Sequence, residues 1–140
     1  MKKAPVIKPA RLSRGDQVGV IAPAGPVSAS DLQPCLKILE SSGFRVRLAP
    51  NVYNRQGYLA GNDEERLKDL HTLFQDQDIK AIFCARGGYG SLRLLDKIRY
   101  DMIKENPKIF VGYSDVTALL LAIHGKTGLV TFHGPMVREF

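Results

Sequence analysis

Short apolar runs alternate along this chain with stretches that repeat their apolar residues at helical spacing. Five such runs cover 17–22, 44–48, 79–85, 108–112 and 129–132. Runs of this length that are rich in Val, Ile and Phe are typical of strands buried within a sheet. Because a helical stretch separates each pair of strands, the order predicts an α/β fold: a doubly wound, mainly parallel sheet of about five strands with flanking helices.

The stretches between the runs carry signals for the ends of helices. We expect four helices: one from a cap at Ser28 or Ser30 to Gly43, one over 63–74, one over 91–98 and one over 115–124. Asn62 and Glu65 have the spacing of a capping box at the start of the second helix. The fourth is apolar nearly all round, so we expect it to be deeply buried and to end at Gly125.

In a parallel sheet, ligand sites collect at the carboxyl ends of the strands. Four loops follow the predicted strands at that edge and are candidates for the functional site: 23–28, 86–91, 113–115 and 133–136. The first of them looks like a rigid turn, and we expect its role to be structural.

Ser114 lies between a predicted strand and a predicted helix. A serine on a sharp strand-to-helix turn can serve as an exposed nucleophile, and Gly112, two residues earlier, suits such a turn. The full elbow pattern has a second glycine two residues after the serine, where this chain has Val116. Serine is also a favoured helix N-cap, and the spacing alone favours that interpretation.

The loop after the third predicted strand contains three glycines, Gly87, Gly88 and Gly90. Such a loop before a helix can bind an anion through its backbone N–H groups, either as a phosphate cradle or as an oxyanion hole. Neither a dinucleotide fingerprint nor a P-loop is present, and a flexible loop without a ligand remains an alternative. Arg86 can clamp a carboxylate or simply lie on the surface.

The histidines and cysteines point to no metal site. We expect His71 to be solvated and His124 to stabilise the end of a helix, which leaves His133 as the histidine nearest the ligand edge. No convincing pair of histidine and acid accompanies Ser114, and no metal or cofactor is expected. Two cysteines are too few for a disulfide framework, so we expect free thiols in a reducing compartment, the cytoplasm.

The formal net charge of +6 comes almost entirely from the first residues. Residues 1–14 contain five basic and no acidic side chains, whereas the remainder contains 15 basic and 14 acidic ones. We therefore expect a basic N-terminal arm over 1–14 and one domain over 15–140, with no nucleic-acid partner. No apolar run approaches the roughly 20 residues of a membrane span, so no membrane partner is expected.

Five blocks of sequence, taken together, carry a family resemblance. They are A-P-A-G at 22–25, G-Y-L-A-G-N-D-E-E-R-L-K-D-L at 57–70, A-R-G-G-Y-G at 85–90, V-G-Y-S-D-V-T-A-L at 111–119 and H-G-P-M at 133–136. In this order they resemble the LD-carboxypeptidase family of serine peptidases. The family includes muramoyltetrapeptide carboxypeptidases of cell-wall recycling and peptidases that confer immunity to microcin C.

The resemblance implies a flavodoxin-like N-terminal domain that carries the nucleophile. It assigns the nucleophile to Ser114 and the oxyanion hole to the backbone N–H groups of Gly88 and Asp115. The substrate-binding positions that it implies are Arg86, Gly87 and Tyr89.

The resemblance further implies that these 140 residues are the N-terminal half of an enzyme. The triad glutamate and histidine are then expected in an absent C-terminal domain, and the fragment alone is expected to be inactive. The implied reaction is hydrolysis of the bond between meso-diaminopimelate and terminal D-alanine in murein tetrapeptides, by a cytoplasmic enzyme that forms a homodimer. Two alternatives stay open: cleavage of microcin C-like peptide-nucleotides, and a non-catalytic α/β ligand-binding module.

Overall fold

The computed structural model describes residues 5–140 and confirms the predicted α/β architecture. Its sheet is made of β1 (Gln17–Ile21), β2 (Arg45–Leu48), β3 (Ile79–Cys84), β4 (Ile109–Gly112) and β5 (Phe132–His133). The strand order is β2-β1-β3-β4-β5, and every neighbouring pair is parallel. Of the basic arm expected over 1–14, residues 1–4 lie outside the described residues.

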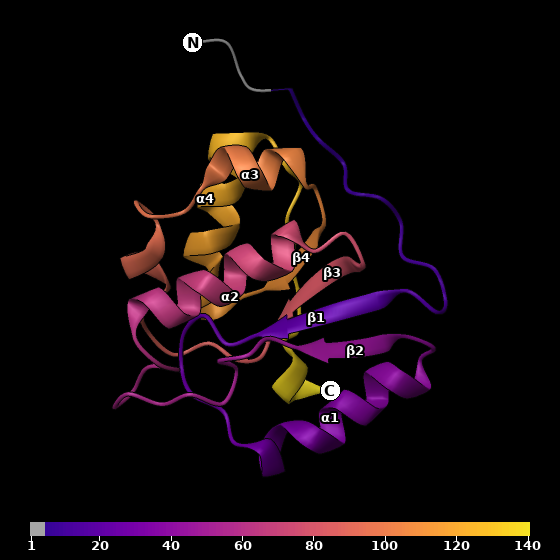
Figure 1. Ribbon diagram of the computed structural model, residues 1–140, viewed down its shortest axis with the longest axis vertical. Coiled ribbons are helices and arrows are strands. Elements are labelled where there is room, and N and C mark those ends of the chain that lie inside the picture. Colours follow the sequence, from indigo (N-terminus) through magenta and orange to yellow (C-terminus); the bar gives the residue numbers. More distant parts are fainter. Residues whose placement is uncertain (1–4) are drawn as a thin grey trace.

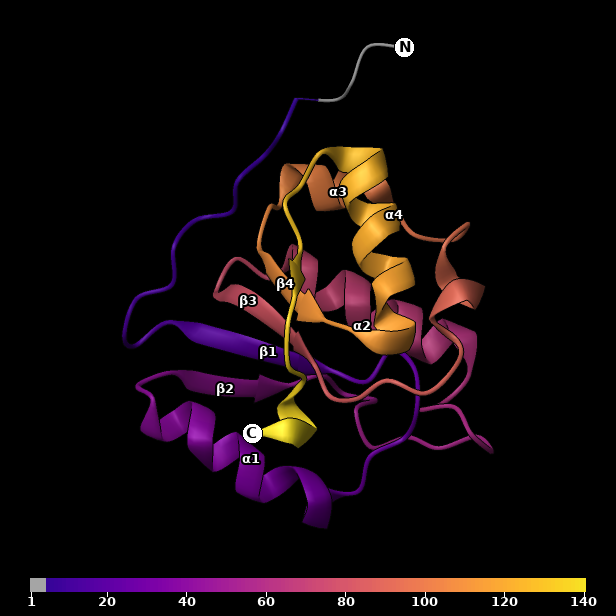
Figure 2. The ribbon, with the colours of Figure 1, turned by 180° about the vertical axis from the view of Figure 1, so that it is seen from behind.

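Within residues 5–140, four α-helices cover the two faces of the sheet. They are α1 (Ala29–Ser41), α2 (Asp63–Gln75), α3 (Tyr100–Glu105) and α4 (Thr117–Thr127), and three short 3-10 turns cover Ser91–Leu94, Ser114–Val116 and Val137–Glu139. Helices α2, α3 and α4 lie on one face and α1 on the other (Figure 1). After β5 the chain returns to the α1 side, where the last 3-10 turn packs against α1 (Figure 2).

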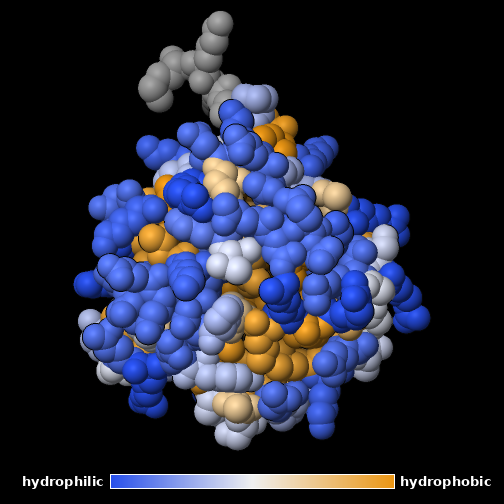
Figure 3. Space-filling view, in the orientation of Figure 1, coloured by the Kyte–Doolittle hydropathy of each residue, from blue (hydrophilic) through white to orange (hydrophobic). Residues whose placement is uncertain are grey.

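Each face of the sheet has its own apolar core. The larger core joins the sheet to α2, α3 and α4, and the rings of Phe74 and Phe110 stack in it with centroids 5.8 Å apart. The smaller core joins the sheet to α1 and to the C-terminal turn. On the face seen in Figure 3 the surface is mostly polar, and apolar side chains emerge near β2 and the C-terminal end.

The predicted starts of the first two helices are confirmed. The side chain of Ser28 accepts a hydrogen bond from the amide of Asp31 (3.1 Å) at the start of α1. At the start of α2, Asn62 and Glu65 form a complete capping box, with bonds of 2.8 and 2.9 Å.

The helix expected over 91–98 is wrong. Only a 3-10 turn forms at Ser91–Leu94, and Leu92, expected to face inward, is 68% exposed. The first residue of this segment is hydrogen bonded to another part of the chain, because the amide and hydroxyl of Ser91 both donate to Asp115. The α-helix begins later, at Tyr100.

The boundaries predicted around α4 are also wrong. The helix continues past Gly125 and ends at Gly128, whose φ of +81° is left-handed. Thr127 extends it, because its hydroxyl donates to the Ile123 carbonyl (2.6 Å) and accepts from the Leu129 amide (3.0 Å). Leu129 then pairs with Ile7 of the N-terminal segment, so β5 starts at Phe132 instead of residue 129.

His71 is not solvated as expected but half-buried on α2. Its Nε2 accepts a hydrogen bond from the amide of Arg99 (3.1 Å). Burial lowers the pKa of His71, and the nearby charge of Arg99 lowers it further. No helix among residues 5–140 is long and apolar enough to cross a membrane.

Candidate active site

Ser114 has a left-handed backbone, with a φ of +57°, and is the one non-glycine residue of 5–140 with a positive φ. It follows β4 directly, after Tyr113 in extended conformation. Its side chain caps neither the 3-10 turn Ser114–Val116 nor α4, so the N-cap interpretation is wrong. A left-handed serine between a strand and a helix is the geometry of a nucleophile elbow.

Gly112 is required at this elbow for steric reasons. A Cβ on Gly112 would lie 2.6 Å from Cγ1 of Val116, closer than any two carbons can pack. Val116 occupies the position where the elbow pattern has its second glycine, and its side chain fills the space over Gly112. The turn is therefore built with one glycine and one buried valine.

The glycine loop lies directly against Ser114. A Cβ on Gly87 would be 3.1 Å from both Cβ and Oγ of Ser114. The carbonyl oxygen of Gly87 accepts a hydrogen bond from the amide of Gly25 (2.9 Å). Since C=O and N–H point in opposite directions across a trans peptide, the N–H of Gly88 faces away from Gly25. Within residues 5–140 that N–H has no hydrogen-bond acceptor.

A pocket of about 310 Å³ opens at Ser114. It is lined by Ala85, Arg86, Gly87, Gly88, Tyr113, Ser114, Met136, Arg138 and Glu139. The guanidinium of Arg86 donates to the carbonyl of Pro26 (3.0 Å), which fixes this cation beside the pocket. The structure thus brings Ser114, Arg86, Gly87 and Gly88 together, as the sequence predicted.

The C-terminal side of the pocket was predicted only in part: Met136 belongs to the candidate loop 133–136, whereas Arg138 and Glu139 were missed by sequence reasoning. Met136, Arg138 and Glu139 line it from the 3-10 turn Val137–Glu139 and the residue before it. The hydroxyl of Tyr113 donates to the Glu139 carboxylate, and this bond raises the pKa of Tyr113. Residues 137–139 belong to none of the sequence blocks quoted above, and only the tertiary fold places them beside Ser114.

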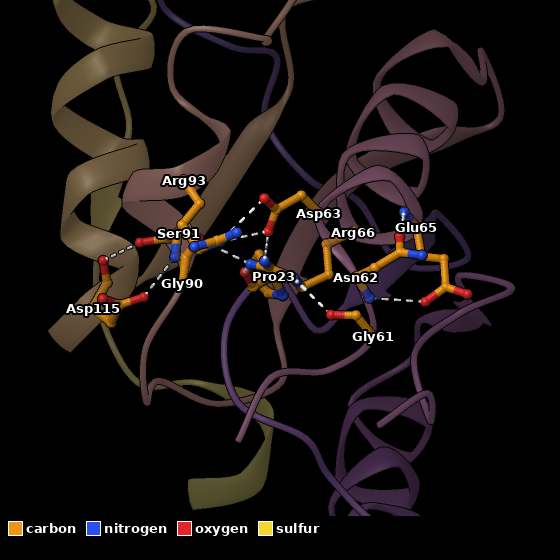
Figure 4. Close-up of polar contacts among 10 residues, drawn as sticks. All are labelled: Pro23, Gly61, Asn62, Asp63, Glu65, Arg66, Gly90, Ser91, Arg93 and Asp115. Carbon is orange, nitrogen blue, oxygen red and sulfur yellow. Dashed lines mark hydrogen bonds and ion pairs between the residues drawn. The ribbon is translucent and has the colours of Figure 1, made fainter. Parts of the chain in front are cut away.

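Asp115 connects the elbow to the glycine loop. Its carboxylate accepts from the amide of Ser91 (3.0 Å), and its carbonyl oxygen accepts from the Ser91 hydroxyl (2.5 Å), as Figure 4 shows. Its own amide lies in the first turn of a helix, where N–H groups have no intrahelical partner.

Tyr89 lies outside the pocket of Ser114. It is 70% exposed, and its ring meets that of Tyr58 edge-on, with centroids 6.0 Å apart. Together with Leu92 the two rings line a separate apolar hollow, which reaches Asp115 from the other side.

No histidine among residues 5–140 is hydrogen bonded to a carboxylate. His124 bonds through Nδ1 to the Leu129 carbonyl (3.0 Å), and the ring of His133 lies 5.8 Å from that of Tyr113, centroid to centroid. The described part of the chain therefore contains no oriented base for Ser114. It also contains no cluster of three or more metal-ligating side chains.

Known proteins are similar to this chain in sequence and in fold. A family model described as the LD-carboxypeptidase N-terminal domain matches residues 18–134. The chain is 52% identical over 130 residues to the probable murein peptide carboxypeptidase of Bacillus subtilis, a match that covers 93% of this chain and 41% of that protein. It is 36% identical over 129 residues to the microcin C7 self-immunity protein MccF of Escherichia coli, covering 90% of this chain and 38% of that protein.

A solved structure of a relative superposes closely on this fold. The crystal structure of an MccF-like protein from Bacillus anthracis superposes with a TM-score of 0.92 at 39% identity, covering 96% of this chain and 42% of that one. The chain therefore spans less than half the length of the relatives that it matches.

Proposed function

Because the chain belongs to the LD-carboxypeptidase family, we propose that it is the nucleophile domain of a serine carboxypeptidase, with Ser114 as the nucleophile. The left-handed backbone of Ser114 carries this proposal. A non-glycine residue stays in that conformation only where the surrounding structure enforces it, and such strain clusters at functional sites. A plain ligand-binding module has no need for a strained serine.

The backbone N–H groups of Gly88 and Asp115 form the oxyanion hole in this proposal. Attack by Oγ converts the substrate carbonyl into a tetrahedral oxyanion, which needs donors that are already oriented. The bond from Gly25 to Gly87 supports this role for Gly88, because it turns the free N–H of Gly88 away from the first loop. Collapse of the intermediate expels the C-terminal residue and leaves an acyl-enzyme, which water then hydrolyses.

The substrate that we favour is a murein tetrapeptide, cleaved between meso-diaminopimelate and terminal D-alanine. Support comes from the relative at 52% identity, which is named a murein peptide carboxypeptidase, while MccF is 36% identical. A carboxypeptidase must also recognise a terminal carboxylate, and two arginines, Arg86 and Arg138, are among the residues that line the pocket. Cleavage of microcin C-like peptide-nucleotides is the second candidate.

The remaining catalytic groups belong to a longer protein in this proposal. A histidine base and a glutamate that orients it come from a C-terminal domain, and the 140-residue chain alone is inactive. We place the whole enzyme in the cytoplasm, as a homodimer that recycles cell-wall peptides.

Release of D-alanine from murein tetrapeptide tests the proposal. The full-length protein, its Ser114→Ala variant and the 140-residue chain are compared, with a microcin C-type peptide-nucleotide as second substrate. We expect activity in the full-length protein only, reduced by about 10⁴-fold or more in Ser114→Ala. Wild-type activity in Ser114→Ala would refute the assignment of the nucleophile, and D-alanine release by the short chain would refute the division of the triad.

A further inference from the structure

The guanidinium of Arg66 is completely buried, with no exposed side-chain surface. It extends from the first turn of α2 beneath the loops that follow β1 and β3 (Figure 4). Nη1 donates to the carbonyls of Pro23 (2.8 Å) and Gly90 (2.9 Å). Nε donates to Gly61 (3.3 Å) and Nη2 to the Asp63 carboxylate (2.5 Å). A buried cation is tolerated only when its donors are satisfied in this way.

One peptide group joins Arg66 to the elbow. The carbonyl of Gly90 accepts from Arg66, and on the opposite side of the same peptide the N–H of Ser91 donates to the Asp115 carboxylate (3.0 Å). A trans peptide is a rigid plane, so its position is fixed from both sides. Gly90 also leaves the room that Arg66 needs, because a Cβ there would lie 2.8 Å from Nη1 of Arg66.

We propose that Arg66 is a positioning residue for the reaction at Ser114. Through the Gly90–Ser91 peptide it fixes the glycine loop, which carries the N–H of Gly88, relative to Asp115. Through Pro23 it also fixes the turn whose Gly25 amide orients the Gly87 carbonyl. The proposal rests on the proposed function, in which the N–H groups of Gly88 and Asp115 must converge on one oxyanion.

Arg93 offers a matched control. Its Nε donates to the same carboxylate of Asp63 (2.8 Å), and this bond is the main cause that lowers the pKa of Asp63. The side chain of Arg93 is however 58% exposed and donates no bond to the glycine loop. The amide of Arg93 does donate to the Gly90 carbonyl (3.1 Å), but a change of side chain leaves that amide in place. The Arg93 side chain therefore shares the ion pair of Arg66 without the contact that positions the loop.

The test compares Arg66→Lys with Arg93→Lys in the full-length protein. Lysine keeps the charge, but its single nitrogen cannot replace all three donating nitrogens of Arg66: Nη1 to the carbonyls of the two loops, Nη2 to the Asp63 carboxylate and Nε to Gly61. For Arg66→Lys we expect kcat to fall about 100-fold while KM changes less, the effect of misplacing catalytic groups by about 1 Å. Arg93→Lys should keep kcat within about twofold, as an exposed ion pair contributes little. Loss of thermal stability in Arg66→Lys with unchanged kcat would overturn the proposal.

Two further measurements keep the test decisive. If Arg66→Lys fails to fold, Gly90→Ala displaces the guanidinium of Arg66 from the same peptide, because the added Cβ would lie 2.8 Å from Nη1, and an unchanged kcat there overturns the proposal. Crystal structures of the wild type and Arg66→Lys also measure the distance between the Gly88 and Asp115 nitrogens. An unchanged distance overturns the positioning role even if the wild type is no peptidase, whereas an active Ser114→Ala variant counts only against the proposed function.

Discussion

The amide of Gly25 donates to the carbonyl oxygen of Gly87 (2.9 Å), and the two loops approach so closely here that neither Gly25 nor Gly88 has room for a side chain. A Cβ on Gly25 would lie 2.7 Å from that oxygen. A Cβ on Gly88 would lie 3.1 Å from the backbone of Gly25. The turn after β1, which the sequence predicted to be structural, thus packs directly against the backbone of the glycine loop and fixes its position.

Gly25→Ala should therefore damage the site. The added methyl group must push the Gly87 carbonyl aside, which we expect to destabilise the protein by about 1–3 kcal/mol. It should also lower kcat of the full-length protein, because the N–H of Gly88 turns with that peptide. Urea denaturation and release of D-alanine measure the two effects.

Gly125→Ala is the matched control. Position 125 lies within α4, and nothing lies within 4 Å of the Cβ that it would gain. Alanine should stabilise this helix by up to about 1 kcal/mol without changing kcat. Equal effects of the two substitutions would contradict a specific contact at Gly25.

Ser114→Gly should be more stable than Ser114→Ala. Both variants lack Oγ, and both should be inactive, but only glycine adopts a φ near +57° without strain. We expect a difference of about 1 kcal/mol in the free energy of unfolding, the cost of a left-handed non-glycine residue. Equal stability of the two variants would mean that the elbow stores no strain.

The sequence predicted the elements whose signals are local. The capping box at Asn62 and the cap at Ser28 lie within four residues of the helices that they start, and both form. The parallel sheet follows from the alternation of strands and helices, which places the loops of Ser114 and of the glycines at one edge.

The parts that stayed hidden depend on contacts between distant segments. In the sequence Arg66 is one of several charged residues in the helix expected over 63–74, and only the convergence of three loops buries it. The helix expected over 91–98 is reduced to a 3-10 turn by the contact of Ser91 with Asp115, 24 positions away. The left-handed backbone of Ser114 has no local signature either, because a serine between a strand and a helix is also a favoured N-cap.

The contact between Gly112 and Val116 predicts a compensating pair. Gly112→Ala places a methyl group 2.6 Å from Val116 and should cost about 1–3 kcal/mol of stability by overpacking. Val116→Ala removes the clashing carbons, so the double variant should be more stable than the sum of the two single effects implies. Chemical denaturation of all four proteins measures this coupling. Additive effects would show that the two positions do not share the space.

His71 predicts a loss of stability in mild acid. The pKa of His71 is lowered in the folded protein, mainly by burial, and its Nε2 must be unprotonated to accept the Arg99 amide. As the pH falls below the ordinary histidine pKa of about 6.5, the unfolded chain binds a proton that the folded chain does not. The free energy of unfolding therefore decreases until the pH reaches the folded pKa. In His71→Gln the amide oxygen accepts the same bond and does not titrate. Urea denaturation at several pH values should therefore show a smaller loss in His71→Gln than in the wild type, and equal losses would rule out His71 as the cause.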